Sequence, residues 1–216
     1  MNSFYDEIKL EQEKYSQNNQ DLLVLFLLGK SPGYFVEFGA TDGISGSNTL
    51  LLEKLGWDGI VAEPSDIFHQ RLYKNRNCHI DTSCVSNVSG DHVVFYEVGD
   101  SGLSSMERYA NNDMWSIARQ SHIKKEVITI TLKDLLDKYD APKVIDYLSI
   151  DTEGAEFDIL NSYDFSRHFK VITVEHNHTS MKNDIHELLS KNGYLQIFSD
   201  LSDWDNWYIH LESMRG

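Results

Sequence analysis

Two acidic segments that contain glycine have the residue types and spacing best suited to chemistry. The first is Glu37-Phe38-Gly39-Ala40-Thr41-Asp42-Gly43, which follows an apolar run and precedes a helix-like segment over residues 48–55. The glycines allow the backbone to approach a ligand with positive φ, and a helix N-terminus offers free N–H groups. A strand that ends in such a turn before a helix is typical of a nucleotide-like cofactor site. The alternative is that the glycines only make a tight turn.

A carboxylate for a ribose follows at the expected distance. Glu63 ends the strand-like run over residues 59–62, about 20 residues beyond the glycine loop, which is the usual place for an acid that binds a ribose diol. Pro64 comes directly after it. The loop and Glu63 together favour the cofactor interpretation over the tight turn alone.

The loop also indicates which cofactor is bound. In the dinucleotide pattern G-x-G-x-x-G the middle glycine admits a pyrophosphate, and here that position is Thr41. Glu37 would repel a diphosphate, whereas it suits an ammonium group. S-adenosylmethionine carries an ammonium, a sulfonium and a ribose diol but no phosphate, so it is the cofactor we predict. A nicotinamide-dependent oxidoreductase is the weaker alternative.

The second segment is Asp151-Thr152-Glu153-Gly154-Ala155-Glu156. The apolar run before it places Asp151 at the exit of a predicted strand over residues 145–150. Three neighbouring carboxylates repel one another unless they are solvated or bind a cation. Acids in the first turn of a helix also interact well with its dipole, which is an alternative explanation for Glu153 and Glu156. For Asp151 we favour a role in the active site.

These segments must be positioned by an α/β fold. Strands predicted at 34–38, 59–63, 78–83, 145–150 and 170–174 alternate with helices, for example over 66–75 and 180–191, which is the pattern of a doubly wound parallel sheet. We expect residues 92–98 and 127–130 to pair as an antiparallel excursion around an irregular loop, 99–123. The last strands are 194–198 and 207–211. We expect a helical segment over residues 1–30, in two pieces, and a catalytic domain over 31–216, within a single domain overall.

Ligands of open α/β sheets bind beyond the carboxyl ends of the strands. Polar or small residues follow five of the predicted strands at those ends. The expected cofactor site therefore comprises Glu37, Gly39, Ala40, Thr41, Asp42, Gly43, Asn48, Thr49, Glu63, Pro64, Ser83, Cys84, Val85 and Asp151.

The composition restricts the partners. The 216 residues carry 34 acids and 19 bases, a net charge of −15, which repels nucleic acid and anionic lipid. The longest apolar run, 22–28, is too short to span a bilayer. The N-terminus lacks the basic region of a signal peptide, and Cys78 and Cys84 do not form a C-x-x-C pair. We therefore expect a cytoplasmic protein without membrane insertion, and the oligomeric state is left open.

The two acidic segments together resemble the FkbM-type methyltransferase family. Gly102-Leu103-Ser104-Ser105-Met106 resembles the serine-rich segment that this family has between them. The resemblance covers residues 32–200 and implies a Rossmann-like methyltransferase fold, with a mostly parallel seven-stranded sheet, helices on both faces and an antiparallel last strand. It also implies transfer of a methyl group from S-adenosylmethionine to a hydroxyl of a sugar or a small natural product. The family's loop often reads Gly-Ala-Asn-x-Gly, from which Thr41-Asp42 departs.

A hydroxyl acceptor requires a base and a place to bind. His176 is the first candidate base, because imidazole accepts a proton near neutral pH, and Asp151 is the second. Asp151, Glu175 and His176 could also converge on Mg²⁺ or Mn²⁺, since oxygen ligands with one imidazole suit these ions. A non-catalytic module that binds a cofactor or a glycan is the other alternative. The expected acceptor contacts are Ser104, Ser105, Arg108, Tyr109, Trp115, Glu153 and His178.

Overall fold

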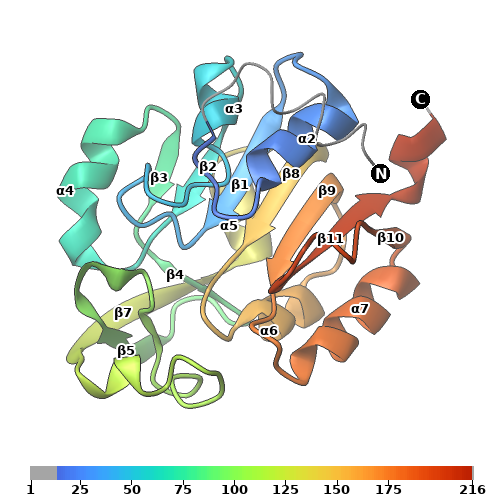
Figure 1. Cartoon of the computed structure of the whole chain (residues 1–216). Coiled ribbons are helices and arrows are strands. Elements are labelled where there is room, and N and C mark those ends of the chain that lie inside the picture. The colour runs from blue at the N-terminus through green and yellow to red at the C-terminus, as the bar shows by residue number, and fades with distance from the viewer. Residues whose placement is uncertain (1–13, 216) are drawn as a thin grey trace.

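The structure, a computed structural model, describes residues 14–215. Within this range the main sheet has seven strands in the order β10-β11-β9-β8-β1-β2-β3 (Figure 1). All neighbours pair in parallel except β11, which is antiparallel to β9 and β10. This confirms the predicted fold class, including its antiparallel last strand. The strands are β1 (Tyr34–Phe38), β2 (Asp58–Ala62), β3 (His79–Asp81), β8 (Val144–Ile150), β9 (His168–Glu175), β10 (Tyr194–Ile197) and β11 (Asp205–His210).

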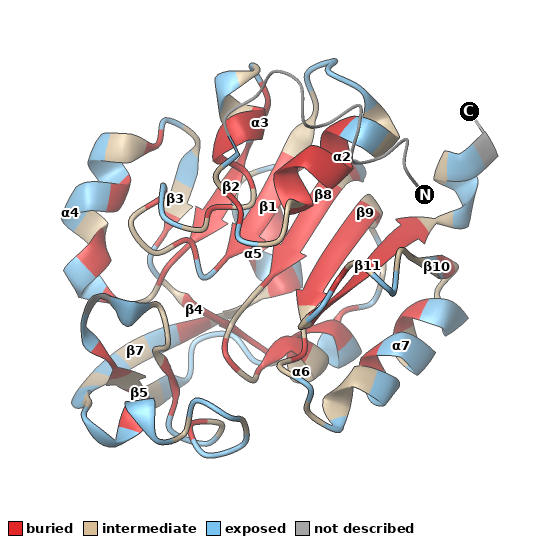
Figure 2. Ribbon diagram, in the orientation of Figure 1, coloured by how far each residue is buried: buried red, intermediate tan, exposed pale blue. Residues whose placement is uncertain are grey.

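Helices cover both faces of this sheet (Figure 1). One face packs against α2 (Gln20–Leu28), α3 (Leu50–Lys54) and α4 (Asp66–Asn75), the other against α5 (Leu132–Lys138), α6 (Glu156–Ser162) and α7 (Met181–Lys191). Because side chains alternate along a strand, neighbours such as Tyr147 and Leu148 enter different apolar clusters. The central strands of this sheet are mostly buried (Figure 2). Burial on both faces explains why they are continuous apolar runs in the sequence.

A smaller sheet lies beside the main one. It has the order β4-β7-β5-β6, with β4 (Cys84–Ser86), β5 (His92–Glu97), β6 (Ser105–Met106) and β7 (Ile123–Thr131). The expected antiparallel pairing of residues 92–98 with 127–130 is confirmed in β5 and β7. The parallel pairing of β4 with β7 was not predicted, because strands of two or three residues are too short to leave a periodic pattern.

Several boundaries differ from those predicted. The strand expected over residues 78–83 ends at Asp81, whose carboxylate accepts a hydrogen bond from Ser83 N at 2.8 Å, and the chain then leaves the main sheet. After β8 the next helix, α6, begins only at Glu156, because Glu153 and Gly154 adopt positive φ. Thr131 caps α5, its hydroxyl accepting a hydrogen bond from Asp134 N at 3.1 Å.

The N-terminal segment joins the core of the main sheet. The second of its two predicted helical pieces is α2, whose Leu22, Val24 and Leu25 pack in the same cluster as Phe35 of β1. The first piece falls largely on residues 1–13, outside the described residues. Among the residues that the structure does describe, no helix is long and apolar enough to cross a membrane.

Candidate active site

A cavity of about 620 Å³ opens at the carboxyl ends of β1, β2, β8 and β9. One side is covered by residues 99–122, which we call the lid loop. They contain the short strand β6 and two short 3-10 helices, η1 (Gly99–Ser101) and η2 (Ala118–Gln120). The position agrees with the rule that ligands of open α/β sheets bind beyond the strand ends. The predicted site residues that line the cavity are Gly39, Thr41, Glu63, Pro64, Ser83, Cys84, Val85, Ser104, Trp115, Asp151, Glu153, Glu175 and His178.

Two loop glycines are required by close packing within the protein. A β-carbon on Gly39 would lie 2.1 Å from the carbonyl oxygen of Asp151, and one on Gly43 would lie 2.6 Å from Cγ of Arg76. Both glycines also have positive φ. The glycine pattern therefore brings the ends of β1 and β8 together, and it places Asp151 directly beside the loop.

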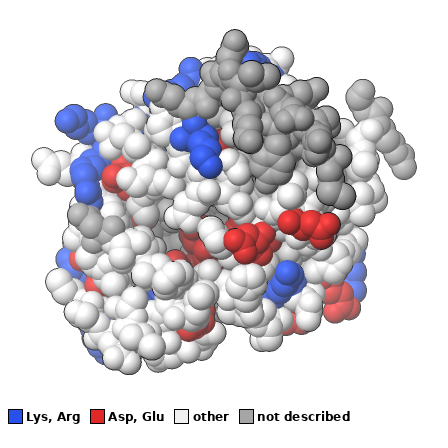
Figure 3. Space-filling view, viewed as in Figure 1, with Lys and Arg blue, Asp and Glu red and all other residues white. Residues whose placement is uncertain are grey.

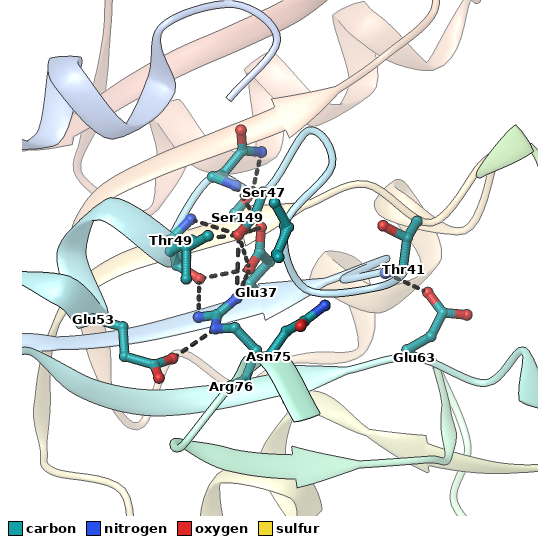
Figure 4. Close-up of polar contacts among 12 residues, drawn as sticks. Glu37, Thr41, Ser47, Thr49, Glu53, Glu63, Asn75, Arg76 and Ser149 are labelled. Carbon is teal, nitrogen blue, oxygen red and sulfur yellow. Dashed lines mark hydrogen bonds and ion pairs between the residues drawn. The ribbon is translucent and has the colours of Figure 1, made fainter. Parts of the chain in front are cut away.

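Glu37 points away from this cavity, into a buried polar network (Figure 4). Its carboxylate accepts hydrogen bonds from Asn48 N at 2.6 Å and from the Thr49 hydroxyl at 2.5 Å, and Nη1 of Arg76 lies 3.2 Å away. Nε of Arg76 also donates to Glu53 at 2.6 Å. These contacts of Glu37 with Asn48 and Thr49 fix the turn between β1 and α3. Ala40 is buried, and the Asp42 carboxylate accepts hydrogen bonds from the backbone N–H of residues 44 and 45.

Glu63 faces the cavity from the end of β2. Its two oxygens accept hydrogen bonds from the backbone N–H of Thr41 and of Ser65, each at 2.8 Å (Figure 4 shows the Thr41 contact). Burial raises the pKa of this carboxyl to about 7, the nearby charge of Glu97 adds to the rise, and the two backbone hydrogen bonds oppose it. The contacts hold the carboxylate in place, and the lone pairs that they leave free can accept the hydroxyls of a ligand.

Three carboxylates meet at the other end of the cavity. Asp151, Glu153 and Glu175 each place an oxygen within 4.8 Å of the others. Burial raises the pKa of Asp151 to about 7, although a hydrogen bond with Glu175 opposes the rise. Burial and the charge of Asp151 raise the pKa of Glu175 further, so these two carboxyls share a proton near neutral pH. The metal set predicted from the sequence included His176, whereas the group that the structure gathers has Glu153 instead.

His176 lies behind the cavity wall. It is buried, and its Nδ1 accepts a hydrogen bond from His178 N at 3.0 Å, while its Nε2 has no hydrogen-bond partner among the described residues. Burial, together with the charges of Lys182 and His178, lowers the pKa of this imidazole to about 4. The ring is therefore neutral at physiological pH and a weak base.

The residues expected to bind the acceptor are divided between the cavity and its support. Ser104, Trp115, Glu153 and His178 line the cavity. The remaining three hold the lid loop to the body of the protein. In this group Ser105 donates to the carbonyl of Glu153 at 2.7 Å, Arg108 donates to Ser86 at 2.9 Å, and the Tyr109 hydroxyl donates to Asp158.

Left-handed backbone is concentrated at the cavity. Thr41, Glu153, Asn177 and His178 line it with φ of 46°, 58°, 43° and 56°. Such conformations are uncommon outside glycine and are maintained only where the surroundings determine them, as at binding sites. Asn177 was not predicted as a site residue, although it stands between the two histidines after β9. Gln17 and Phe68 also line the cavity, and no motif in the sequence marks them.

Comparison with known proteins found similar solved structures and a matching family model. Solved structures similar to this chain include a ribosomal protein L11 methylase from Lactobacillus delbrueckii subsp. bulgaricus, with 11% identity, 93% of this chain and 80% of that chain covered, and a TM-score of 0.47. A precorrin-6y C5,15-methyltransferase from Geobacter metallireducens GS-15 has 12% identity, coverage of 94% and 93%, and a TM-score of 0.47.

The family follows from the sequence comparison. The model described as the methyltransferase FkbM domain matches residues 37–195. The chain therefore belongs to the FkbM methyltransferase domain family, as its two acidic segments predicted, and is by family an S-adenosylmethionine-dependent methyltransferase. No curated protein matches the chain.

Proposed function

We propose that this protein transfers a methyl group from S-adenosylmethionine to a hydroxyl of a sugar or a small natural product. The observation that carries the proposal is the charge of the cavity. Glu63, Asp151, Glu153 and Glu175 line it, and none of the described lining residues is a lysine or an arginine. Acidic side chains also gather near the middle of the molecule in the view of Figure 3. Although Arg119 pairs with Glu153 and burial keeps Glu175 protonated, Glu63 and Asp151 still supply negative charge, so the cavity favours a cationic donor and disfavours a phosphate.

The part of the cavity near β2 suits an adenosine. Glu63 offers carboxylate oxygens to a ribose diol, while the side chains of Phe68, Val85 and Phe95 form apolar surface beside it. The part near β1 suits the amino-acid end of the donor. There Gly39, Thr41 and Asp151 lie together, and Asp151 supplies negative charge for an ammonium or a sulfonium.

Asp151 is the base that we assign to the reaction. The donor supplies an electrophilic methyl group, and the protein must hold an acceptor hydroxyl and take its proton. A carboxylate with a pKa of about 7 is matched to that task at neutral pH, whereas the pKa of His176 is about 4. Glu175 holds a proton at neutral pH and donates it in a hydrogen bond to Asp151, which favours the ionised form of Asp151 that the reaction needs.

We expect the part of the acceptor that enters the cavity to be a neutral polyol. Carboxylates and the amide of Asn177 can bind hydroxyls, and Trp115 offers an aromatic face for a sugar ring. A phosphate or carboxylate on the acceptor would have to remain outside, because the lining repels it. A role for Mg²⁺ or Mn²⁺ and a cytoplasmic location remain predictions.

The lining also weighs against a nicotinamide-dependent oxidoreductase. A nicotinamide dinucleotide would bring a diphosphate against acidic side chains, with no lysine or arginine among the described lining residues to pair with it. Turnover, and not the charge, separates an enzyme from a module that binds a cofactor or a glycan without catalysis.

Calorimetry followed by turnover tests the proposal. We expect S-adenosylhomocysteine to bind and NADH not to bind, and Glu63→Gln to weaken the binding at least tenfold, whereas Glu107→Gln, an exposed acid, leaves it unchanged. Labelled S-adenosylmethionine is then incubated with a panel of neutral methyl glycosides and nucleotide sugars. Binding without transfer to any of them would favour the non-catalytic module. Absence of S-adenosylhomocysteine binding would contradict the proposal altogether.

A further inference from the structure

Arg119 connects the lid loop to the acidic end of the cavity. It lies in η2, and its side chain is almost completely buried. Within the lid loop its Nε donates to the carbonyl of Leu103 at 2.7 Å, and its Nη1 donates to Asp113 at 2.7 Å. Its Nη2 donates to the carboxylate of Glu153, which lies outside the lid loop, at 2.6 Å. One guanidinium therefore joins two parts of the lid loop to a residue of the cavity wall.

Glu153 is held by the lid loop at two points. Its backbone carbonyl accepts a hydrogen bond from the Ser105 hydroxyl, and its carboxylate pairs with Arg119. Its left-handed backbone is of the kind that persists only under such constraint. Glu153 follows β8 and lies outside the lid loop. Because the lid loop makes both of these contacts, the position of Glu153 depends on whether the lid loop is in place.

The carboxylate of Glu153 also belongs to a second network. Nδ2 of Asn177 lies 3.3 Å from its Oε2 and 2.7 Å from the carboxylate of Glu175. Asn177 and the three acids line the end of the cavity where we place the acceptor. A displacement of Glu153 would therefore change the carboxylate oxygens that face the methyl acceptor. The contacts of Glu63, at the end of the cavity where we place S-adenosylmethionine, would remain.

We propose that Arg119 is a positioning residue for methyl transfer, which places the carboxylate of Glu153 against the acceptor when the lid loop covers the cavity. The acceptor side of this inference rests on the proposed function, whereas the link between Arg119 and Glu153 does not. Lysine cannot replace arginine here, because the three contacts use separate nitrogens of a rigid planar group.

Hydrogen–deuterium exchange tests the link without any acceptor. We expect Arg119→Gln and Arg119→Lys to increase exchange in the lid loop and in residues 152–154, with no change in residues 39–46. Affinity for S-adenosylhomocysteine should stay within about twofold of the wild type. Glu153→Gln should increase exchange in the lid loop as well, which tests the same contact from its other side if the Arg119 variants fold poorly. Lys191→Gln is the control, because Lys191 is exposed and pairs with Glu187 within α7, outside the lid loop.

Unchanged exchange at residues 152–154 in the Arg119 variants, or in the lid loop of Glu153→Gln, would overturn the link.

Kinetics with the best acceptor of the glycoside panel tests the consequence. We expect Arg119→Gln to lower kcat/KM on the order of 100-fold, as displaced positioning groups do. Arg119→Gln combined with Glu153→Gln should be no slower than the slower single variant, because both remove the same placement. If the factors by which the two substitutions lower kcat/KM multiply in the double variant, Arg119 does not act through Glu153. If the wild type transfers no methyl group, the proposed function fails, and the exchange experiment still decides the link.

Discussion

The backbone carbonyl of Asp151 occupies the space where a β-carbon on Gly39 would stand, 2.1 Å from that position. Two strand ends that are far apart in the sequence therefore meet without room for a side chain. The contact fixes the cofactor loop relative to the residue that we assign as the base.

Replacement of Gly39 by alanine should destabilise the protein by about 3 kcal/mol, since the new methyl group meets backbone and the φ is left-handed. Urea denaturation measures the change. Gly90→Ala is the matched control, because Gly90 also has positive φ but has no atom within 4 Å of an added β-carbon. It should cost about 1 kcal/mol. Equal effects of the two substitutions would show that the close approach is unimportant.

Glu63 should make stability fall as the pH rises. Its pKa in the folded protein is about 7 against an ordinary value of 4.5, so the folded state binds the proton more tightly than the unfolded state. The stabilisation is complete below pH 4.5 and is lost as the pH rises through 7. The loss is on the order of 3 kcal/mol. Unfolding of Glu63→Gln at several pH values should show a smaller decline than the wild type, and an identical decline would contradict the assignment.

The pH dependence of transfer should identify the base. If Asp151 accepts the proton, kcat rises with pH until about 7, where its carboxyl is ionised. If His176 were the base, the rise would end near pH 4. Asp151→Asn should reduce kcat by about 10² to 10⁴. His176→Asn, which keeps a hydrogen-bond acceptor for His178 N, should retain the same pH profile.

Removal of the Arg76 side chain should destabilise the turn between β1 and α3. Its guanidinium is buried and pairs with Glu37 and Glu53, so Arg76→Met leaves two carboxylates without their cation. Breaking a buried pair from one side costs about 3–5 kcal/mol. The same loss should appear in Glu37→Leu, and the double variant should recover part of it, as measured by thermal unfolding. Full additivity of the two losses would contradict a shared network.

The fold could be predicted because its strands are buried on both faces and read as apolar runs. The positions of Glu63 and Asp151 at the cavity followed from the rule that ligands bind at strand ends. The direction in which Glu37 points did not follow, because its partner Arg76 is 39 residues away in the sequence and no local pattern joins them. Arg119 was missed for the same reason, since an arginine in an irregular loop has no periodic signal and its burial depends on how the loop folds.

The acidic lining has a further consequence for the catalytic cycle. Methyl transfer converts a sulfonium into a neutral thioether, so the spent donor loses one of its two positive charges and keeps its ammonium. The acidic lining should therefore hold the fresh donor more tightly than S-adenosylhomocysteine, which favours exchange of spent donor for fresh donor after each turnover.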